Sequence, residues 1–198
     1  MATVIGLTGS IASGKSTVSA YLHQQGYCVI DADQVVHELQ AKGGRLYEAL
    51  VQHFGPEIVR EDGELDRPKL SELIFSNPDI KQQSAHLQDQ VIREELAERL
   101  KQAQTEQDVV FMDIPLLYEL GYESWCDEVW LVYVDRETQL SRLMLRNGYS
   151  QEEAQKRLDA QLSLEEKKAR ADVVLENNRT LDCLYEQVDL ALKTMGEK

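Results

Sequence analysis

The feature that most restricts the fold of this chain is a short apolar run that leads directly into a glycine-rich segment. TVIGLT at residues 3–8 is followed by GSIASGKST at residues 9–17, which matches the pattern G-x-x-x-x-G-K-[ST] in full. The four matching positions are Gly9, Gly14, Lys15 and Ser16. In this pattern the glycines let backbone N–H groups turn toward phosphates, the lysine reaches the β- and γ-oxygens, and the hydroxyl can ligate Mg²⁺. The segment therefore predicts a strand, a phosphate-binding loop and a helix in succession.

Five short runs rich in Val, Ile, Leu and aromatic residues are spread along the chain. They lie at residues 3–8, 27–32, 108–114, 128–135 and 172–177. Most of them are continuously apolar rather than alternating, which is typical of strands that are covered on both faces. Helical patterns separate the runs. The predicted fold class is therefore α/β, with a doubly wound, five-stranded parallel sheet.

The spacing of these runs indicates a large helical insertion. A single helix over 15–25 is enough for the first crossover, but residues 33–107 greatly exceed the length of one crossover helix. Within them, Asp66 and the segment 76–78 are both typical of capped helix starts with proline in the first turn. Residues 86–102 have the apolar spacing of a long amphipathic helix. We therefore expect the segment 33–107 to be mostly helical.

A second elaboration follows the fourth run. ETQLSRLMLRNG at residues 137–148 predicts a helix that ends at Gly148, and two later segments match the capping box Ser-x-x-Glu, at Ser150 and at Ser163. Two further short helices are expected there. The arginines of this region are Arg142, Arg146 and Arg157. Helices that carry arginines over the open end of a sheet would form a lid that excludes water from a phosphoryl-transfer site.

The expected organisation is one chain, residues 1–198, with a single well-buried core and two elaborations. Residues 1–32, 108–136 and 171–198 are expected to form the nucleotide-binding core, residues 33–107 the helical insertion, and residues 137–170 the lid helices.

Composition excludes several classes of partner. The net charge is −14, from 35 acidic and 21 basic residues, which argues against a nucleic-acid-binding protein. The three cysteines are far apart and form no Cys-x-x-Cys pair, which suits a reducing compartment. No apolar stretch has the length needed to span a bilayer. We expect a cytoplasmic protein without a nucleic-acid or membrane partner, and the sequence leaves the oligomeric state open.

The loop motif predicts nucleotide binding but does not by itself define the reaction. The chain contains neither the Asn/Thr-Lys-x-Asp motif of guanine-reading switches nor an LSGGQ-like signature of transport ATPases. The small size, the helical insertion and the arginine-bearing helices favour a phosphotransferase. A nucleotide or nucleoside kinase and a nucleotide-dependent regulatory protein remain alternatives at this point.

IDADQVVH at residues 30–37 supplies two carboxylates at the end of the second predicted strand. The carboxyl ends of parallel strands are where ligands bind in open α/β sheets. Asp31 or Asp33 could accept the proton of an attacking hydroxyl, although one of them could instead cap the following helix. His37 is ambiguous by itself. Asp113, at the end of the third run, could hold a Mg²⁺-bound water or cap the next turn.

These segments together resemble the dephospho-coenzyme A kinase family. The resemblance covers nearly the whole chain and depends on several motifs in the family's order, which are GLTGSIASGKST, VIDAD with a following His, DGELDR, DIPLLYE, QLSRLMLRNGYS and ADVVLENN. It implies a P-loop kinase-like fold. It also implies transfer of the ATP γ-phosphate, with Mg²⁺, to the ribose 3′-hydroxyl of dephospho-coenzyme A, the last step of coenzyme A biosynthesis.

The resemblance also implies roles for individual residues. Asp33 would be the general base, Arg146 would face the phosphates with Arg142 nearby, and Asn177 would lie near the adenine. The residues expected to cover the ATP phosphates are Ala12, Ser13, Gly14, Lys15, Ser16 and Thr17. The insertion would bind the acceptor, and the expected acceptor-binding residues are Asp31, Asp33, His37, Arg67 and His86. Ser16 and Asp113 would hold the metal.

The chain departs from the family pattern at a few positions. Ser10 and Ala12 stand where the family often has glycine, and we expect alanine to be tolerated at position 12 only if its φ is negative. Leu87 follows His86 where the family usually has proline, and Asn178 and Arg179 stand where it often has glycine.

Overall fold

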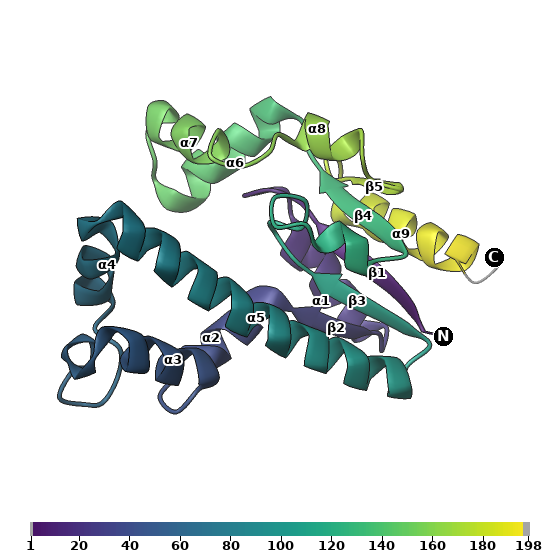
Figure 1. Ribbon diagram of the computed structural model, residues 1–198. Helices are drawn as coiled ribbons and strands as arrows, with labels where there is room; N and C mark the ends of the chain where they lie inside the picture. Colours follow the sequence, from purple (N-terminus) through teal and green to yellow (C-terminus); the bar gives the residue numbers. More distant parts are fainter. Residues whose placement is uncertain (1, 196–198) are drawn as a thin grey trace. The chain divides into compact units, whose positions relative to one another are not determined.

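A five-stranded sheet organises the computed structural model, which describes residues 2–195 (Figure 1). Its strands are β1 (Thr3–Thr8), β2 (Cys28–Asp31), β3 (Val109–Asp113), β4 (Glu128–Tyr133) and β5 (Val173–Glu176). Their order is β2-β3-β1-β4-β5, with β1 parallel to both β3 and β4, and β5 parallel to β4. Each predicted apolar run contains one of these strands, and the predicted α/β class is confirmed.

The central strand β1 shows why the runs are continuously apolar. Ile5 and Leu7 on one face have no exposed surface, and on the other face Val4 is 3 % exposed and Thr8 is fully buried. Side chains on both faces of the strand are therefore buried. Position 6, between Ile5 and Leu7, has no room for a side chain, because a Cβ at Gly6 would come within 2.5 Å of Leu117 Cδ1.

The described chain divides into two compact units, one made of the residues up to 29 and from 103 onward, and the other of residues 30–102. The first unit contains α1 (Lys15–Gln24), η2 (Tyr122–Trp125), α6 (Arg136–Asn147), α7 (Gln151–Leu158), α8 (Leu164–Lys168) and α9 (Leu181–Met195). Its main core joins α1 and α9 to the sheet through Leu22, Leu184 and Trp130. The predicted helix over 15–25 is confirmed.

The second unit contains α2 (Ala32–Leu39), α3 (Arg45–Phe54), η1 (Pro56–Ile58), α4 (Arg67–Ser76) and most of α5 (Pro78–Glu106). Leu46, Leu50 and Ile58 are fully buried in it. As predicted, Asp66 caps α4, and its side chain accepts a hydrogen bond from Lys69 N at 3.1 Å.

The predicted helix over 86–102 is longer in the structure and begins at Pro78, at the capped start predicted for the segment 76–78. The reason is that the added first turns are held by polar contacts rather than by an apolar stripe. Asn77 Oδ1 accepts a hydrogen bond from Asp79 N at 2.8 Å, which starts the helix. Apolar periodicity cannot detect such a segment.

The three short helices of the predicted lid region have the expected boundaries. Gly148 has a φ of +67° and ends α6. Ser150 begins α7 and Ser163 begins α8, each within a complete capping box. Leu143, Ala154 and Leu158 form a small buried cluster that joins α6 to α7.

Candidate active site

The loop after β1 closes tightly because two of its positions have no room for a side chain. A Cβ at Gly9 would lie 2.5 Å from Ser13 Oγ, and one at Gly14 would lie 2.1 Å from Asn177 Nδ2. Gly14 also has a φ of +94°, a conformation that glycine adopts readily. Ser13 is fully buried, and its backbone N–H donates to Ser10 O at 3.1 Å. The glycine spacing of the motif is therefore required by close packing.

The expectation for Ala12 is wrong. Its φ is +62°, and it is the one non-glycine residue with a positive φ within the described chain. This conformation costs roughly 1–2 kcal/mol for an L-residue. Ala12 and Ile11 pack against the buried cluster that joins α6 to α7. The apolar contact offsets part of the backbone strain, which is why alanine is tolerated here.

The N-terminus of α1 is open to an anion. Its N-cap residue is Gly14, which provides no side-chain hydrogen bond, and the first turn contains no acidic residue. The first backbone N–H groups of a helix have no partner within the helix, and the helix dipole makes this end positive. Ser16 is exposed in the first turn. This arrangement is suited to binding phosphate.

Lys15 forms an ion pair with Asp113, between its Nζ and the carboxylate Oδ1. The Asp113 side chain is 2 % exposed and the Lys15 side chain 15 %. Asp113 ends β3 and pairs in register with Leu7 of β1, so it lies at the base of the phosphate loop. The two roles predicted for Asp113, holding a Mg²⁺-bound water or capping the next turn, stay predictions. The structure shows it paired with Lys15, the lysine of the phosphate-loop motif.

The segment after β5 supports the loop from another side. Asn177 is 5 % exposed, and its Nδ2 donates a hydrogen bond to Ser13 O at 2.9 Å. Arg142 of α6 donates to Asn177 O, also at 2.9 Å. The predicted nucleotide-site residues Ser13, Arg142 and Asn177 are thus brought together with the loop.

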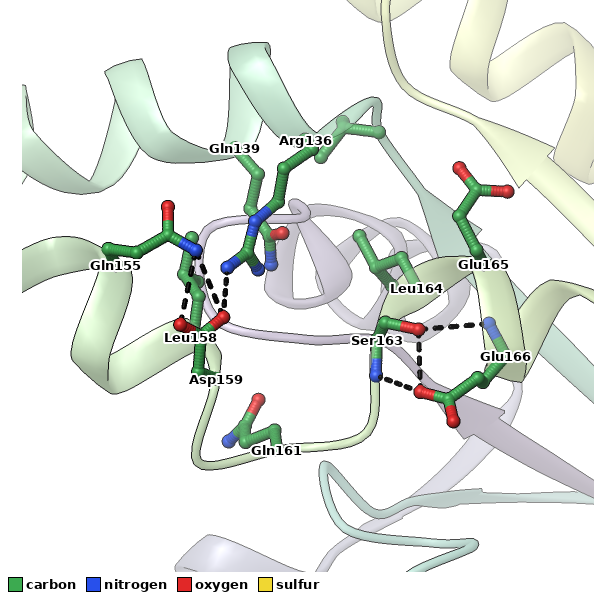
Figure 2. A pocket seen from close by; sticks show the side chains of 11 residues that line it. Arg136, Gln139, Gln155, Leu158, Asp159, Gln161, Ser163, Leu164, Glu165 and Glu166 are labelled. Atoms are coloured by element: carbon green, nitrogen blue, oxygen red, sulfur yellow. Dashed lines mark hydrogen bonds and ion pairs between the residues drawn. The ribbon is translucent and has the colours of Figure 1, made fainter.

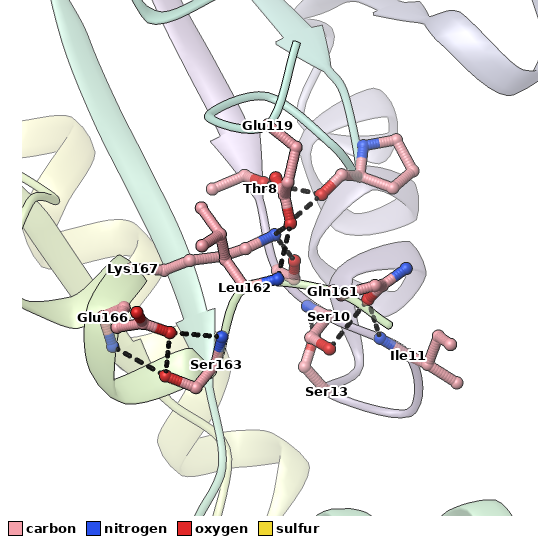
Figure 3. A network of polar contacts seen from close by, with 12 residues as sticks. Thr8, Ser10, Ile11, Ser13, Glu119, Gln161, Leu162, Ser163, Glu166 and Lys167 are labelled. Carbon is pink, nitrogen blue, oxygen red and sulfur yellow. Dashed lines mark hydrogen bonds and ion pairs between the residues drawn. The ribbon is translucent and has the colours of Figure 1, made fainter. Parts of the chain in front are cut away.

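Two glutamines hold the first turn of the loop, and Figure 3 shows one of them, Gln161. Gln161, in the linker between α7 and α8, accepts a hydrogen bond from Ser10 Oγ at 2.9 Å. Gln139 of α6 is 1 % exposed, and its Nε2 donates to Ser10 Oγ at 2.9 Å and to Ile11 O at 2.8 Å. The loop is therefore joined directly to α6 and to the linker between α7 and α8.

The same two glutamines line a cavity of about 480 Å³ between α6 and the segment from α7 to α8 (Figure 2). Its lining residues all lie between Val134 and Glu166, and on one side Arg136 pairs with Asp159. Lys15 and Ser16 are not among them. This cavity is therefore separate from the predicted phosphate site.

A family model described as dephospho-CoA kinase matches residues 3–182. The chain belongs to the dephospho-CoA kinase family. A dephospho-CoA kinase of Streptococcus agalactiae is 55% identical over 195 residues, which are 98% of this chain and 100% of that protein. As a member of this family, the chain is a kinase. The resemblance to the family that its sequence motifs indicated is confirmed.

Solved structures agree with this assignment. A dephospho-CoA kinase from Campylobacter jejuni is 29% identical, has a TM-score of 0.75 and is matched over 100% of both chains. A Thermus thermophilus protein is 38% identical, with a TM-score of 0.79 over 98% of this chain and 97% of that one. The P-loop kinase-like fold predicted for the family is therefore confirmed.

The predicted acceptor residues of this dephospho-CoA kinase lie in the second unit. Asp31 is the N-cap of α2 and accepts a hydrogen bond from Gln34 N at 3.1 Å. Asp33 and His37 are exposed on the same helix, and His86 is exposed on α5. Arg67 donates to Gln40 Oε1 at 2.8 Å, beside a cavity of about 280 Å³. Thus Asp31 takes the capping role that the sequence left open between the two aspartates.

The three lid arginines have different surroundings. Arg142 is partly buried against Asn177, whereas Arg146 is exposed and donates to Asn147 Oδ1 at 2.9 Å. Arg157 lies over the Tyr149 ring, 4.4 Å from its centroid. Arg157 is thus placed by an aromatic contact, which the sequence did not predict.

Sequence reasoning missed the residues that support the loop from behind, namely Gln139, Gln161 and Lys167. Lys167 follows Ser163 by one turn, so the capping box was visible but the burial of the lysine was not. Their partners in the loop are 128 to 158 positions away in the chain.

Between residues 2 and 195, none of the helices combines the length and apolar character needed to cross a membrane.

Proposed function

We propose that this dephospho-CoA kinase uses its phosphate loop, Lys15 and Asp33 to transfer the γ-phosphoryl group of ATP to the ribose 3′-hydroxyl of dephospho-coenzyme A. This is the last step of coenzyme A biosynthesis. The observation that carries the proposal is the open N-terminus of α1 with Lys15 beside it, in a chain of this family. Catalysis would consist mainly of positioning and charge neutralisation.

On the nucleotide side, the residues from Ala12 to Thr17 would cover the ATP phosphates. Lys15 would exchange its ion pair with Asp113 for the β- and γ-oxygens, which carry more negative charge. Arg146 would approach the transferred group from the lid, and its exposure on α6 leaves it able to do so. The adenine would lie near the loop around Asn177, whose side chain contacts the phosphate loop.

The residues at the loop fit a Mg²⁺ ion. Ser16 offers an exposed hydroxyl and Asp113 a carboxylate, and oxygen ligands are what Mg²⁺ prefers. Among the described residues no group of three or more His, Cys, Asp or Glu could hold a metal ion, so the nucleotide itself would provide much of the ligation. When bound, Mg²⁺ would neutralise phosphate charge.

On the acceptor side, Asp33 would orient the 3′-hydroxyl and accept its proton. Two observations support this role. Asp31 is occupied as the cap of α2, and Asp33 is exposed in the first turn after β2. Asp31, together with His37, Arg67 and His86 of the helical insertion 33–107, would bind the rest of the acceptor.

A panel of acceptors tests this proposal. ADP release from ATP and Mg²⁺ is measured with dephospho-coenzyme A, nucleosides and nucleoside monophosphates, one at a time. We expect strong stimulation by dephospho-coenzyme A alone. Stimulation by a nucleoside or nucleotide instead would indicate a different kinase on this scaffold. Nucleotide binding without any acceptor-dependent ADP release would indicate a regulatory protein.

A further inference from the structure

Lys167 is a fully buried lysine with no role in the reaction described above. Its side chain lies on α8 with no exposed surface. Lysine is almost never fully buried unless it is paired. Its Nζ donates hydrogen bonds to Gly9 O at 2.9 Å and to Pro115 O at 3.0 Å, and it pairs with Glu119 Oε1 at 2.9 Å (Figure 3).

These three contacts use the full donor capacity of one ammonium group and join three separate segments. Gly9 begins the phosphate loop, Pro115 and Glu119 follow β3, and Lys167 belongs to α8. Glu119 Oε1 also accepts a hydrogen bond from Leu162 N at 3.1 Å. The Glu119 carboxylate therefore also holds the linker between α7 and α8. It does so at Leu162, next to Gln161, which contacts Ser10 of the loop.

The contact with Gly9 bears directly on phosphate binding. Gly9 O is the carbonyl that precedes the N–H group of Ser10, so its direction sets how the loop leaves β1. A charged donor on this carbonyl keeps it turned toward α8 and away from the space that the anionic ligand would occupy. Charge-assisted hydrogen bonds of this kind are stronger and shorter than neutral ones.

We propose that Lys167 is a positioning residue for the nucleotide, because it holds the first glycine of the phosphate loop and couples the loop to the lid segment. This inference rests on the proposed role of the loop in binding ATP. It adds to that role a second lysine, behind the loop, which does not touch the substrate.

The ion pair with Glu119 serves a different purpose from the contact with Gly9. Glu119 Oε2 is buried and has no hydrogen-bond partner among the described residues, so Lys167 is the charge that compensates this carboxylate. Burial lowers the pKa of Lys167, and Glu119 acts against that shift. Loss of the ion pair should therefore reduce stability, whereas loss of the Gly9 contact should reduce nucleotide binding.

Four variants separate the two effects. Lys167→Met removes the ion pair with Glu119 and the hydrogen bonds to Gly9 and Pro115, with a side chain of similar length. Glu119→Gln removes the ion pair and leaves the lysine beside Gly9. The double variant Lys167→Met with Glu119→Gln leaves neither partner of this ion pair charged. Lys168→Met changes the neighbouring lysine, which pairs with Glu176 on the exposed side of α8, and serves as the matched control. For each variant we measure Tm, the KM for ATP, kcat, and ADP binding by calorimetry.

We expect Lys167→Met to raise the KM for ATP and the Kd for ADP about tenfold or more, the size of a lost hydrogen bond to a charged group. The double variant should recover part of the lost Tm and keep the weak nucleotide binding. Lys168→Met and Glu119→Gln should stay within about threefold of the unmodified chain in Kd. Near-normal ADP binding by a folded double variant would overturn the inference, and so would an equal loss in Lys168→Met.

Hydrogen exchange in the unmodified chain provides a measurement that does not depend on the folding of any variant. ADP should slow amide exchange in residues 164–168 as well as in the loop, because Lys167 links the two. Protection of the loop with no change in that helix would contradict the coupling. ADP binding is measured without the acceptor, so failure of the acceptor assay leaves this test unaffected.

Discussion

At position 12 an alanine adopts the left-handed conformation that glycine adopts at little cost. The strain is tolerated because the residue packs against the Leu143 cluster of the lid helices. Local preference and tertiary contact therefore disagree at this position, and the tertiary contact decides. Such disagreement is expected at functional loops, where strain is offset by the surrounding structure.

A larger side chain at this position should expose the strain. Ala12→Val places a β-branched residue at a positive φ, and we expect the free energy of unfolding to fall by about 2 kcal/mol. Ala12→Gly serves as the control. It relieves the strain but loses the methyl contact and adds freedom to the unfolded chain, so its change should stay below about 1 kcal/mol. Urea denaturation measures the free energy of unfolding of both variants. If Ala12→Val left this free energy unchanged, the backbone strain at position 12 would be absent.

Asp33 is the residue on which the proposed proton transfer depends. Asp33→Asn should keep ATP binding and lower kcat by a factor of about 10²–10⁴, which is typical of a lost general base. Asp31→Asn is the matched change one position before α2. Asparagine is as good an N-cap as aspartate, so we expect a much smaller loss of kcat. Steady-state kinetics with dephospho-coenzyme A measures both, and a near-normal kcat in Asp33→Asn would remove this residue from the mechanism.

At the scale of elements, the helices of the lid region owe their start points to hydrogen bonds that are local in the chain. Ser163 begins α8, and Glu166 Oε2 accepts a hydrogen bond from the backbone N–H of Ser163 at 3.0 Å. The same arrangement occurs at Ser150 and Glu153 in α7. Because both partners lie within one turn, these boundaries could be read from the sequence, as could the start of α5 after Asn77.

The capping box of α8 should make part of the stability depend on pH. Hydrogen bonds from Ser163 lower the pKa of Glu166 below its ordinary value of 4.5. The contribution to stability is therefore present above pH 4.5 and is lost as the pH falls through the lowered pKa. Glu166→Gln keeps the box but cannot titrate, so Tm should fall less steeply between about pH 5 and pH 3.

Thermal unfolding as a function of pH tests this expectation. Glu186→Gln, an exposed change of the same charge on α9, is the control and should leave the slope as it is in the unmodified chain. Equal slopes for Glu166→Gln and the unmodified chain would show that the capping carboxylate does not titrate as expected.

At the scale of the whole molecule, the described chain divides into two compact units, and the phosphate loop belongs to one of them. A ligand that binds only the folded state stabilises it by about 2.7 kcal/mol at 100 times its Kd. For a chain of this size that corresponds to a rise in Tm of roughly 5–10 °C. We expect ATP with Mg²⁺ to produce this shift.

Lys15→Ala should lose most of that shift, because the lysine would bind the β- and γ-phosphates. Lys156→Ala, an exposed change on α7, should keep it. Differential scanning fluorimetry at several ATP concentrations measures the difference. A full shift in Lys15→Ala would contradict the proposed role of this lysine.

The sequence by itself determined the sheet, the phosphate loop and most helix starts of this protein. Each of these features depends on patterns that span only a few residues, such as continuous apolar runs, glycine spacing or a capping pair three positions apart. Asp31 and Asp33 were recognised as candidates in the same way. The family followed from the order of such local motifs along the chain.

The tertiary structure alone decided how the phosphate loop is held. Lys167 contacts Gly9 across 158 positions, and Gln161 contacts Ser10 across 151. The positive φ of Ala12 likewise depends on a cluster formed by α6 and α7. No local pattern marks such residues, because a lysine or glutamine in a short helix or linker has the same sequence surroundings whether it is exposed or buried. Only packing brings the buried ammonium group to the carbonyl of the first glycine.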